Sequence, residues 1–220
     1  MLETAIVLSI TLIFSIVSFK KKLLNTTGII FADVVGGLTF VLGGINSFAA
    51  IVLFYVVAES ATRITKNKEN HEQRTTRNIL GNAGAAILAL FLGQVTPFFG
   101  AISAALADTV SSEIGMLSAN NPRLITSFEK VKKGTDGGIT LLGTIAALIA
   151  GALIGGFYYF AINASLKIAI LIVGAGFFGS IIDSVLGAIM ERKGLLSNTQ
   201  VNFIASSSGA IIVFLGMALL

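Results

Sequence analysis

Long apolar runs separated by short charged loops restrict the fold of this chain more than any other feature. The longer runs cover approximately 2–19, 27–45, 47–62, 79–96, 138–162, 166–190 and 200–220, and a shorter one covers 98–110. A helix that spans a membrane needs about 20 mainly apolar residues. Only 12% of the residues are charged, against about 25% in a typical soluble domain. We therefore expect an all-α, polytopic integral membrane protein with seven to eight transmembrane helices, including one short or half-crossing segment.

The basic residues give these runs an orientation. If the chain starts outside and the short run counts as a crossing, the loops that face the cytoplasm lie near 20–26, 63–78, 111–137 and 191–199. These loops contain fourteen of the 15 Lys and Arg residues, and Lys167 alone lies elsewhere. Cytoplasmic loops typically carry such an excess of basic residues. We therefore expect a single transmembrane domain over 1–220, with basic charge that serves topology and anionic lipid and not nucleic acid.

The available chemistry is limited by the absence of cysteine. Without cysteine there is no disulfide framework, no thiolate nucleophile and no zinc–cysteine site. The single histidine, His71, lies in a polar loop that we expect to be solvated. Catalysis would therefore depend on carboxylates, hydroxyls, backbone amides and bound metal.

Carboxylates inside apolar runs are the strongest functional signal. Asp108 lies in the segment 107–115 and Asp183 in the segment 179–187. A carboxylate at membrane depth costs several kcal/mol unless it is paired, hydrated or bound to metal. In the expected topology both residues reach the cytoplasmic side together with Glu113, where hard oxygen ligands suit Mg²⁺ and its phosphate partners. The alternative is a set of helix-capping carboxylates or salt bridges with bases of the 111–137 loop.

Two helices show small residues at helical spacing. Ala147, Gly151 and Gly155 recur every four residues and predict a face for close helix packing. In the next helix Ser180, Asp183, Gly187 and Glu191 also share one face. A packing face needs no carboxylates, so the second pattern favours a functional role.

A charged loop rich in glycine precedes the 138–162 run. It reads Lys132-Lys133-Gly134-Thr135-Asp136-Gly137-Gly138. Glycines let consecutive N–H groups point toward one anion, and a helix N-terminus adds partial positive charge, which makes the loop a candidate phosphate site. Thr135 or Asp136 could equally be an ordinary N-cap. The spacing does not match a P-loop.

Four motifs occur in an order that resembles one known family. They are Ala-Asp-Thr-x-x-Ser-Glu-Ile-Gly (107–115), Pro-Arg-Leu-Ile-Thr (122–126), Gly-Thr-x-Gly-Gly-Ile-Thr-Leu-Leu-Gly (134–143) and Gly-Ser-x-x-Asp-Ser-x-x-Gly-Ala (179–188). Together they resemble the transmembrane-protein-19-like family, also called domain of unknown function 92. The likeness extends from Arg77 through Asn202. This family includes the plant phytyl-phosphate kinase of tocopherol synthesis.

The resemblance implies a kinase that converts an isoprenoid-alcohol monophosphate into the diphosphate, with a nucleoside triphosphate, expected to be CTP, as donor. Asp108 and Asp183 would coordinate Mg²⁺, and Glu113 would be a further ligand or a base. Lys133, Arg123 and the loop amides would bind phosphate. The remaining predicted substrate and nucleotide contacts are Ser112, Gly134, Thr135, Asp136, Gly137, Gly138, Ser180, Ser184, Asn82 and Asn202.

Two departures from the family pattern add negative charge. Asp136 stands where Asn is common, and Glu191 stands where Gln is common, so the donor and the number of metal ions stay open. Val110 stands where Trp is common.

Two other functions also stay open. One is cytidylyl transfer from CTP to a lipid phosphate, and the other is ion-coupled transport in which Asp33, Asp108 and Asp183 bind protons or cations.

Overall fold

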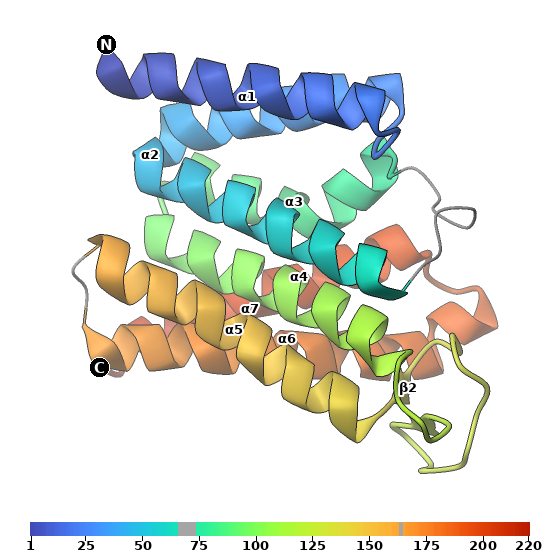
Figure 1. Cartoon of the computed structure of the whole chain (residues 1–220). Helices are drawn as coiled ribbons and strands as arrows, with labels where there is room; N and C mark the ends of the chain where they lie inside the picture. The colour runs from blue at the N-terminus through green and yellow to red at the C-terminus, as the bar shows by residue number, and fades with distance from the viewer. Residues whose placement is uncertain (66–73, 163–164) are drawn as a thin grey trace.

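Helices make up most of the structure, a computed structural model that describes residues 1–65, 74–162 and 165–220 (Figure 1). The helices are α1 (Leu2–Lys20), α2 (Thr26–Thr65), α3 (Thr76–Phe91), α4 (Val95–Gly115), α5 (Leu141–Ile162), α6 (Leu166–Ile189), the short 3₁₀ helix η2 (Glu191–Lys193) and α7 (Asn198–Met217). A two-stranded antiparallel sheet joins β1 (Arg123–Leu124) to β2 (Gly138–Ile139). The all-α membrane fold expected from the apolar runs is confirmed.

The helix α2 consists of two helical segments that meet at Gly44. This residue has φ 75° and ψ −174°, a conformation that favours glycine because it has no Cβ. The two segments run in opposite directions in Figure 1 and correspond to the predicted runs 27–45 and 47–62. The predicted short run 98–110 extends at both ends into the 21-residue α4. Within the described ranges, five helices are long and apolar enough to span a membrane: α1, α2, α5, Leu166–Lys193 and α7.

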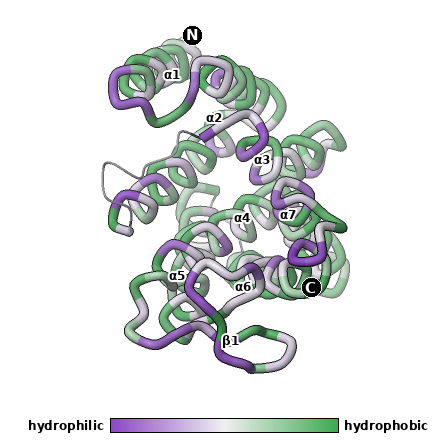
Figure 2. The backbone as a smooth tube through the Cα atoms, turned by 90° about the vertical axis from the view of Figure 1, so that its right-hand side faces the viewer, coloured by the Kyte–Doolittle hydropathy of each residue, from purple (hydrophilic) through white to green (hydrophobic). Residues whose placement is uncertain are grey.

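The connections rich in charge gather at one end of the bundle. The segments 20–26, 116–140 and 190–198 lie opposite both chain termini (Figure 1). Figure 2 views this end and shows hydrophilic segments in the connections. Residues 66–73, which contain His71 and half of the predicted 63–78 loop, lie outside the described residues. The side of the membrane that this end faces remains a prediction.

The helix α4 lies at the centre of the bundle. It packs against α2, α3, α5, α6 and α7, and Phe98, Phe99 and Leu106 have no exposed surface. Small residues bring its neighbours close, as the sequence predicts for α5: a Cβ on Gly151 would lie 3.0 Å from the Val173 carbonyl of α6. The central helix therefore fixes where the ends of the other helices meet.

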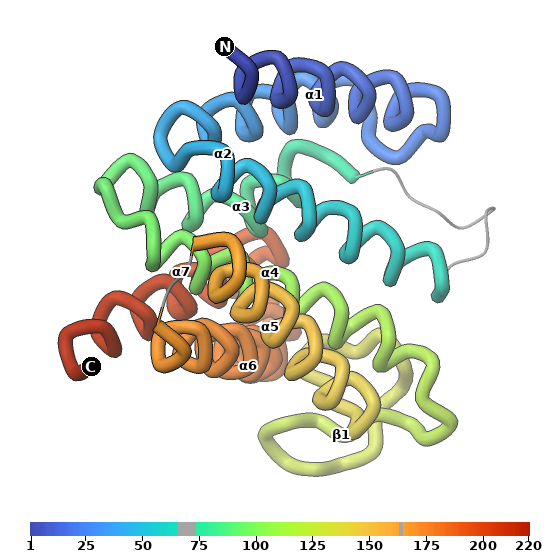
Figure 3. The backbone as a smooth tube through the Cα atoms, turned by 60° about the vertical axis from the view of Figure 1, so that its left-hand side comes forward, coloured from blue at the N-terminus to red at the C-terminus, as the bar shows by residue number. Residues whose placement is uncertain are grey.

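The helix α1 lies at the edge of the bundle. It packs mainly against α2, and Figure 3 shows it along that side, away from α5 and α6. Only Val7 and Ser18 of its residues are buried. Large apolar side chains such as Leu8 and Leu12 are exposed, which suits a helix whose outer face meets lipid.

Candidate active site

A polar cavity of about 480 Å³ opens at the end of the bundle where the charged connections gather. The ends of α2, α3, α4, α6 and α7 and the loop before β2 form its walls. Most of the predicted site residues line it: Asn82, Asp108, Ser112, Glu113, Lys133, Gly134, Thr135, Asp136, Gly137, Gly138, Asp183, Ser184 and Asn202. Segments far apart in the sequence therefore meet at one place.

Two predicted site residues lie outside the lining of this cavity. Arg123 belongs to β1 and is exposed, and its Nη1 donates a hydrogen bond to the Phe128 carbonyl at 2.7 Å. Ser180 is only 4% exposed and is packed inside the bundle. Arg123 thus helps to hold the loop after α4. Neither Arg123 nor Ser180 contacts the cavity.

The carboxyl groups of Asp108 and Asp183 form the centre of the site. They lie within hydrogen-bonding reach of each other, one on α4 and the other on α6. The two helices approach closely one turn away, where a Cβ on Gly179 would overlap the Ala104 side chain. No ion pair joins either aspartate to a Lys or Arg among residues 1–65, 74–162 and 165–220. Two facing carboxylates without a basic partner need a cation or a shared proton between them.

Two asparagines support this carboxylate pair. The Asn202 amide of α7 lies between Asn82 of α3 and Asp183 of α6. In one orientation its nitrogen donates to Asn82 Oδ1 at 3.2 Å, and in the other it donates to Asp183 Oδ2 at 3.1 Å. The second orientation satisfies a carboxylate oxygen, so Asn202 is suited to position Asp183. The substrate or nucleotide contacts of Asn82 and Asn202 stay predictions.

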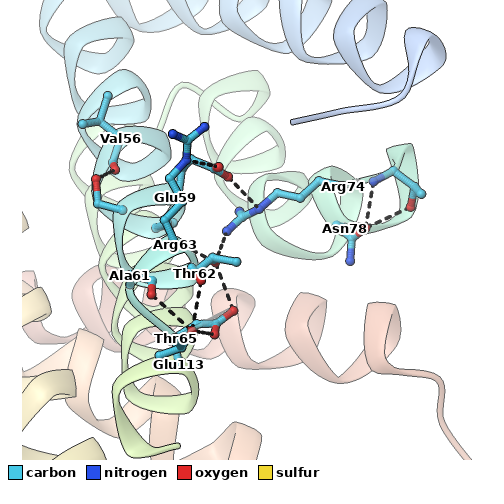
Figure 4. Close-up of polar contacts among 12 residues, drawn as sticks. Val56, Glu59, Ala61, Thr62, Arg63, Thr65, Arg74, Asn78 and Glu113 are labelled. Carbon is cyan, nitrogen blue, oxygen red and sulfur yellow. Dashed lines mark hydrogen bonds and ion pairs between the residues drawn. The ribbon is translucent and has the colours of Figure 1, made fainter. Parts of the chain in front are cut away.

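Glu113 lies apart from the aspartate pair. Its two carboxylate oxygens accept hydrogen bonds from the hydroxyls of Thr62 at 3.0 Å and Thr65 at 2.5 Å (Figure 4). In the described part of the chain, no group of three or more Asp, Glu or His side chains could hold a metal. The expected ligand set of three carboxylates is therefore not assembled. The donor set that remains, Asp108 and Asp183, fits Mg²⁺, which binds through one or two carboxylates and completes its shell with phosphates and waters.

Arg74 is a cavity residue that the sequence analysis did not single out. Its Nη2 donates to Thr62 Oγ1 at 3.1 Å, and its Nε lies 3.9 Å from Glu59 Oε2 (Figure 4). The backbone is held as well, because its N–H donates to the Leu23 carbonyl at 3.0 Å and its carbonyl accepts from Asn25 at 3.3 Å. The guanidinium is thus fixed at the cavity wall. The sequence signal for its position is its place directly before the Thr75–Asn78 capping box of α3.

The glycine loop is a tight turn that packs on the end of α6. The N–H of Gly138 donates to the Thr135 carbonyl at 2.9 Å, and Gly134 and Gly137 have φ of 81° and 74°. A Cβ on Gly137 would lie 2.5 Å from the Ala188 Cβ. Both the backbone conformation and the close approach therefore require glycine at 137.

The N–H groups of the glycine loop differ in their hydrogen bonding. Thr135 and Gly138 use their N–H groups in turns, whereas the N–H groups of Gly134, Asp136 and Gly137 find no acceptor among the described residues. The sequence predicts that this loop lies at the N-terminus of a helix, and this prediction is wrong. Helix α5 begins at Leu141, and Thr140 Oγ1 accepts from the Gly143 N–H at 3.0 Å. Neither Thr135 nor Asp136 is therefore the N-cap.

Lys133 is engaged at the end of α4. Its Nζ donates to the carbonyls of Met116 at 2.8 Å and Ser118 at 2.6 Å. A lysine near a helix C-terminus satisfies the last carbonyls and complements the helix dipole. Because an ammonium group has three donors, one remains for a ligand in the cavity. Lys133 thus has a structural contact in addition to its predicted phosphate contact.

The charge of the lining favours a cation. Among the described residues, five acidic side chains line the cavity against two basic ones, Lys133 and Arg74. The acidic residues are Asp108, Glu113, Asp136, Asp183 and Glu191. An anionic phosphate is therefore repelled unless cations accompany it, which is how a metal-bound nucleoside triphosphate would enter.

A second cavity, of about 310 Å³, lies between α1, α2 and α3. Its lining is mostly apolar and includes Ile10, Phe14, Gly36, Phe48 and Phe54. Three of its residues, Arg74, Asn78 and Asn82, also line the polar cavity. The two cavities therefore share a wall, and a polar space adjoins an apolar one.

A bundle of membrane helices with a polar, carboxylate-lined cavity at one end defines a class of multi-pass membrane proteins. Within this class the chain belongs to the family described as integral membrane protein DUF92, whose model matches residues 9–210. The family expected from the four motifs is thereby confirmed.

Three relatives illustrate the range of this family. An uncharacterised membrane protein of Methanocaldococcus jannaschii is 35% identical over 204 residues, which cover 88% of this chain and 85% of the relative. Protein PGR of Arabidopsis thaliana is 32% identical over 220 residues, with 82% and 76% covered. The chloroplastic protein VTE6 of Arabidopsis thaliana is 27% identical over 215 residues, with 87% and 65% covered. No solved structure matches the chain.

Proposed function

We propose that this protein is a membrane-embedded kinase that transfers a phosphoryl group from a nucleoside triphosphate, with CTP as the preferred donor, to an isoprenoid-alcohol monophosphate. The observation that carries the proposal is the facing pair Asp108 and Asp183 in a polar cavity next to an apolar one. The resemblance to a family that includes a plant phytyl-phosphate kinase, together with the similarity to VTE6, supports the same reaction.

In the proposed reaction an oxygen of the acceptor monophosphate attacks the γ-phosphorus of the nucleotide. A new P–O bond forms as the bond between the γ-phosphorus and the β,γ-bridging oxygen breaks, and the nucleoside diphosphate leaves. The acceptor is already an anion, so no strong general base is needed. Catalysis then depends mainly on alignment and on the neutralisation of charge.

The residues of the cavity divide these tasks. Asp108 and Asp183 would hold Mg²⁺, which when bound neutralises charge on the transferred phosphoryl group. Arg74 would orient the acceptor phosphate, and the third donor of Lys133 would contact the nucleotide. The free N–H groups of the glycine loop would bind its phosphate oxygens.

Product analysis tests this proposal. Purified protein is incubated with Mg²⁺, geranylgeranyl monophosphate and CTP labelled at either the α- or the γ-phosphorus. A kinase places the γ-label in the lipid product and releases CDP. A cytidylyltransferase instead places the α-label in the lipid and releases pyrophosphate. If neither labelled lipid forms, both enzyme functions are contradicted and transport is favoured.

We propose further that the cavity faces the cytoplasm, because the basic residues concentrate at this end. Cysteines introduced at Lys130 and Lys193 should react with impermeant reagent only from the cytoplasmic side. A cysteine at Leu220 should react only from the other side. Reaction of the first two positions from opposite sides would contradict a common site.

A further inference from the structure

The apolar cavity between α1, α2 and α3 is enclosed on its inner side and lightly covered on its outer side. On the inner side Phe48 is 3% exposed and Phe54 is 6% exposed. On the outer side lies α1, which packs mainly against α2. The Phe14 ring of α1 contacts the Tyr55 ring of α2 edge to face, with centroids 4.8 Å apart. A molecule from the membrane therefore has only one peripheral helix to displace.

The wall of the apolar cavity contains few polar groups away from Arg74, and Asp33 is the acidic one among the described residues. Asp33 Oδ2 accepts a hydrogen bond from Ser15 Oγ of α1 at 2.7 Å, whereas Asp33 Oδ1 is buried and has no hydrogen-bond partner among the described residues. The remaining wall consists mainly of aliphatic and aromatic carbon, as in Ile10, Phe14 and Ile51. Contact between such a carbon surface and a hydrocarbon chain is favourable, because it removes apolar area from water.

Polar groups do occur where the two cavities share a wall. Arg74, Asn78 and Asn82 line both spaces, and the Arg74 side chain is only 15% exposed. A guanidinium group recognises phosphate through charge-assisted hydrogen bonds. The wall is therefore suited to a molecule whose anionic head lies in the polar cavity and whose apolar chain lies in the other.

We propose that the apolar cavity holds the hydrocarbon chain of the monophosphate acceptor, with the phosphate at Arg74 and the chain directed toward Gly36 and Phe48. This inference rests on the proposed function, because the proposed function identifies the acceptor as a monophosphate with a hydrocarbon chain. Along α2 the lining runs from Phe48 to Val56, a span of about 12 Å at the helical rise per residue. Gly36 and Phe48 lie at the part of the cavity remote from Arg74. The far end of a long hydrocarbon chain would contact these two residues, so they would limit the chain length that fits.

Gly36 offers a direct test of chain length. A Cβ at this position would lie 3.4 Å from the Phe48 ring, which is ordinary contact, so a larger side chain would extend into the cavity. Gly37 is the matched control, because a Cβ there would meet nothing within 4 Å and the residue does not line the cavity. Gly36→Leu should lower kcat/KM for geranylgeranyl monophosphate about tenfold relative to geranyl monophosphate, whereas Gly37→Leu should leave the ratio unchanged. An unchanged ratio in folded Gly36→Leu protein would overturn the proposal.

A second measurement does not depend on turnover. A long-chain alkyl monophosphate with a diazirine at the chain end is irradiated with the wild-type protein in mixed phospholipid vesicles, and the labelled peptides are mapped. Label concentrated around Phe48 and Ile10, and competed by geranylgeranyl monophosphate but not by geranylgeraniol, supports the chain site even if no kinase product forms. Label spread over lipid-facing surfaces, or equal competition by the alcohol, overturns the chain site even if the kinase is active.

Discussion

Each of the two cavities contains aspartate at membrane depth, and the two differ in what surrounds it. In the apolar cavity Asp33 lies alone and accepts a hydrogen bond from Ser15 at 2.7 Å. In the polar cavity Asp108 and Asp183 lie within reach of each other and of a polar lining. One carboxyl group can be accommodated by hydrogen bonds, whereas two facing carboxylates require a cation or proton. In the proposed function, the second carboxylate therefore distinguishes the metal-binding aspartates from Asp33.

The two cavities also differ in the helices that surround them. The polar cavity is formed where the central helix α4 meets α6, α7 and the glycine loop, and these contacts are tight. The apolar cavity lies under α1, a helix held mainly by α2. A rigid region is suited to aligning reacting phosphates, and a peripheral helix is suited to admitting a chain from lipid.

The largest expected effect comes from removing one of the facing carboxylates. Asp108→Asn and Asp183→Asn should each reduce turnover about a thousandfold or more, because metal binding stabilises the transition state by several kcal/mol. Without Mg²⁺ both variants should melt at or above the wild-type temperature, since a repulsive pair is removed. Assays of lipid phosphorylation with melting curves in detergent measure both effects. Wild-type turnover in either variant would contradict the metal assignment.

The second effect is stabilisation by the metal. Mg²⁺ at a hundred times its dissociation constant should stabilise the wild-type protein by about 2.7 kcal/mol, provided that it binds only the folded state. The same concentration should leave the melting temperature of Asp108→Asn nearly unchanged. Thermal unfolding across a Mg²⁺ titration measures the shift. An equal shift in the wild type and the variant would place the metal elsewhere.

The third effect concerns the wall that joins the two cavities. Arg74→Gln should raise KM for the monophosphate acceptor about ten- to a hundredfold, because a charge-assisted hydrogen bond contributes about 1.5–3 kcal/mol. Glu59 keeps the ion pair with Arg63, whose Nε lies 2.9 Å from Glu59 Oε1. Arg77→Gln is the matched control, since Arg77 is exposed and lines neither cavity. Equal KM values for the two variants would remove Arg74 from the binding site.

The helices could be predicted from the sequence because membrane-spanning helices are encoded locally as apolar runs. The meeting of Asp108 with Asp183 also followed from their positions near the same ends of two helices. The bonding of Glu113 to Thr62 and Thr65 did not, because it depends on which face of α4 turns toward α2. Arg74 was counted among the topological bases, and only the folded chain brings it to the shared wall. Side-chain direction across helix contacts is the information that one sequence lacks.

The smallest effect is expected at Asp33, and it tests the comparison of the two cavities most directly. Asp33→Asn keeps the shape of the side chain and an oxygen that can accept the Ser15 hydrogen bond, so stability should change by no more than about 1 kcal/mol. Turnover and its dependence on Mg²⁺ should match the wild type, in contrast to Asp108→Asn. The two variants are compared in the same phosphorylation and melting assays. A loss of turnover at Asp33 as large as that at Asp108 would mean that the three aspartates act together, as ion-coupled transport requires.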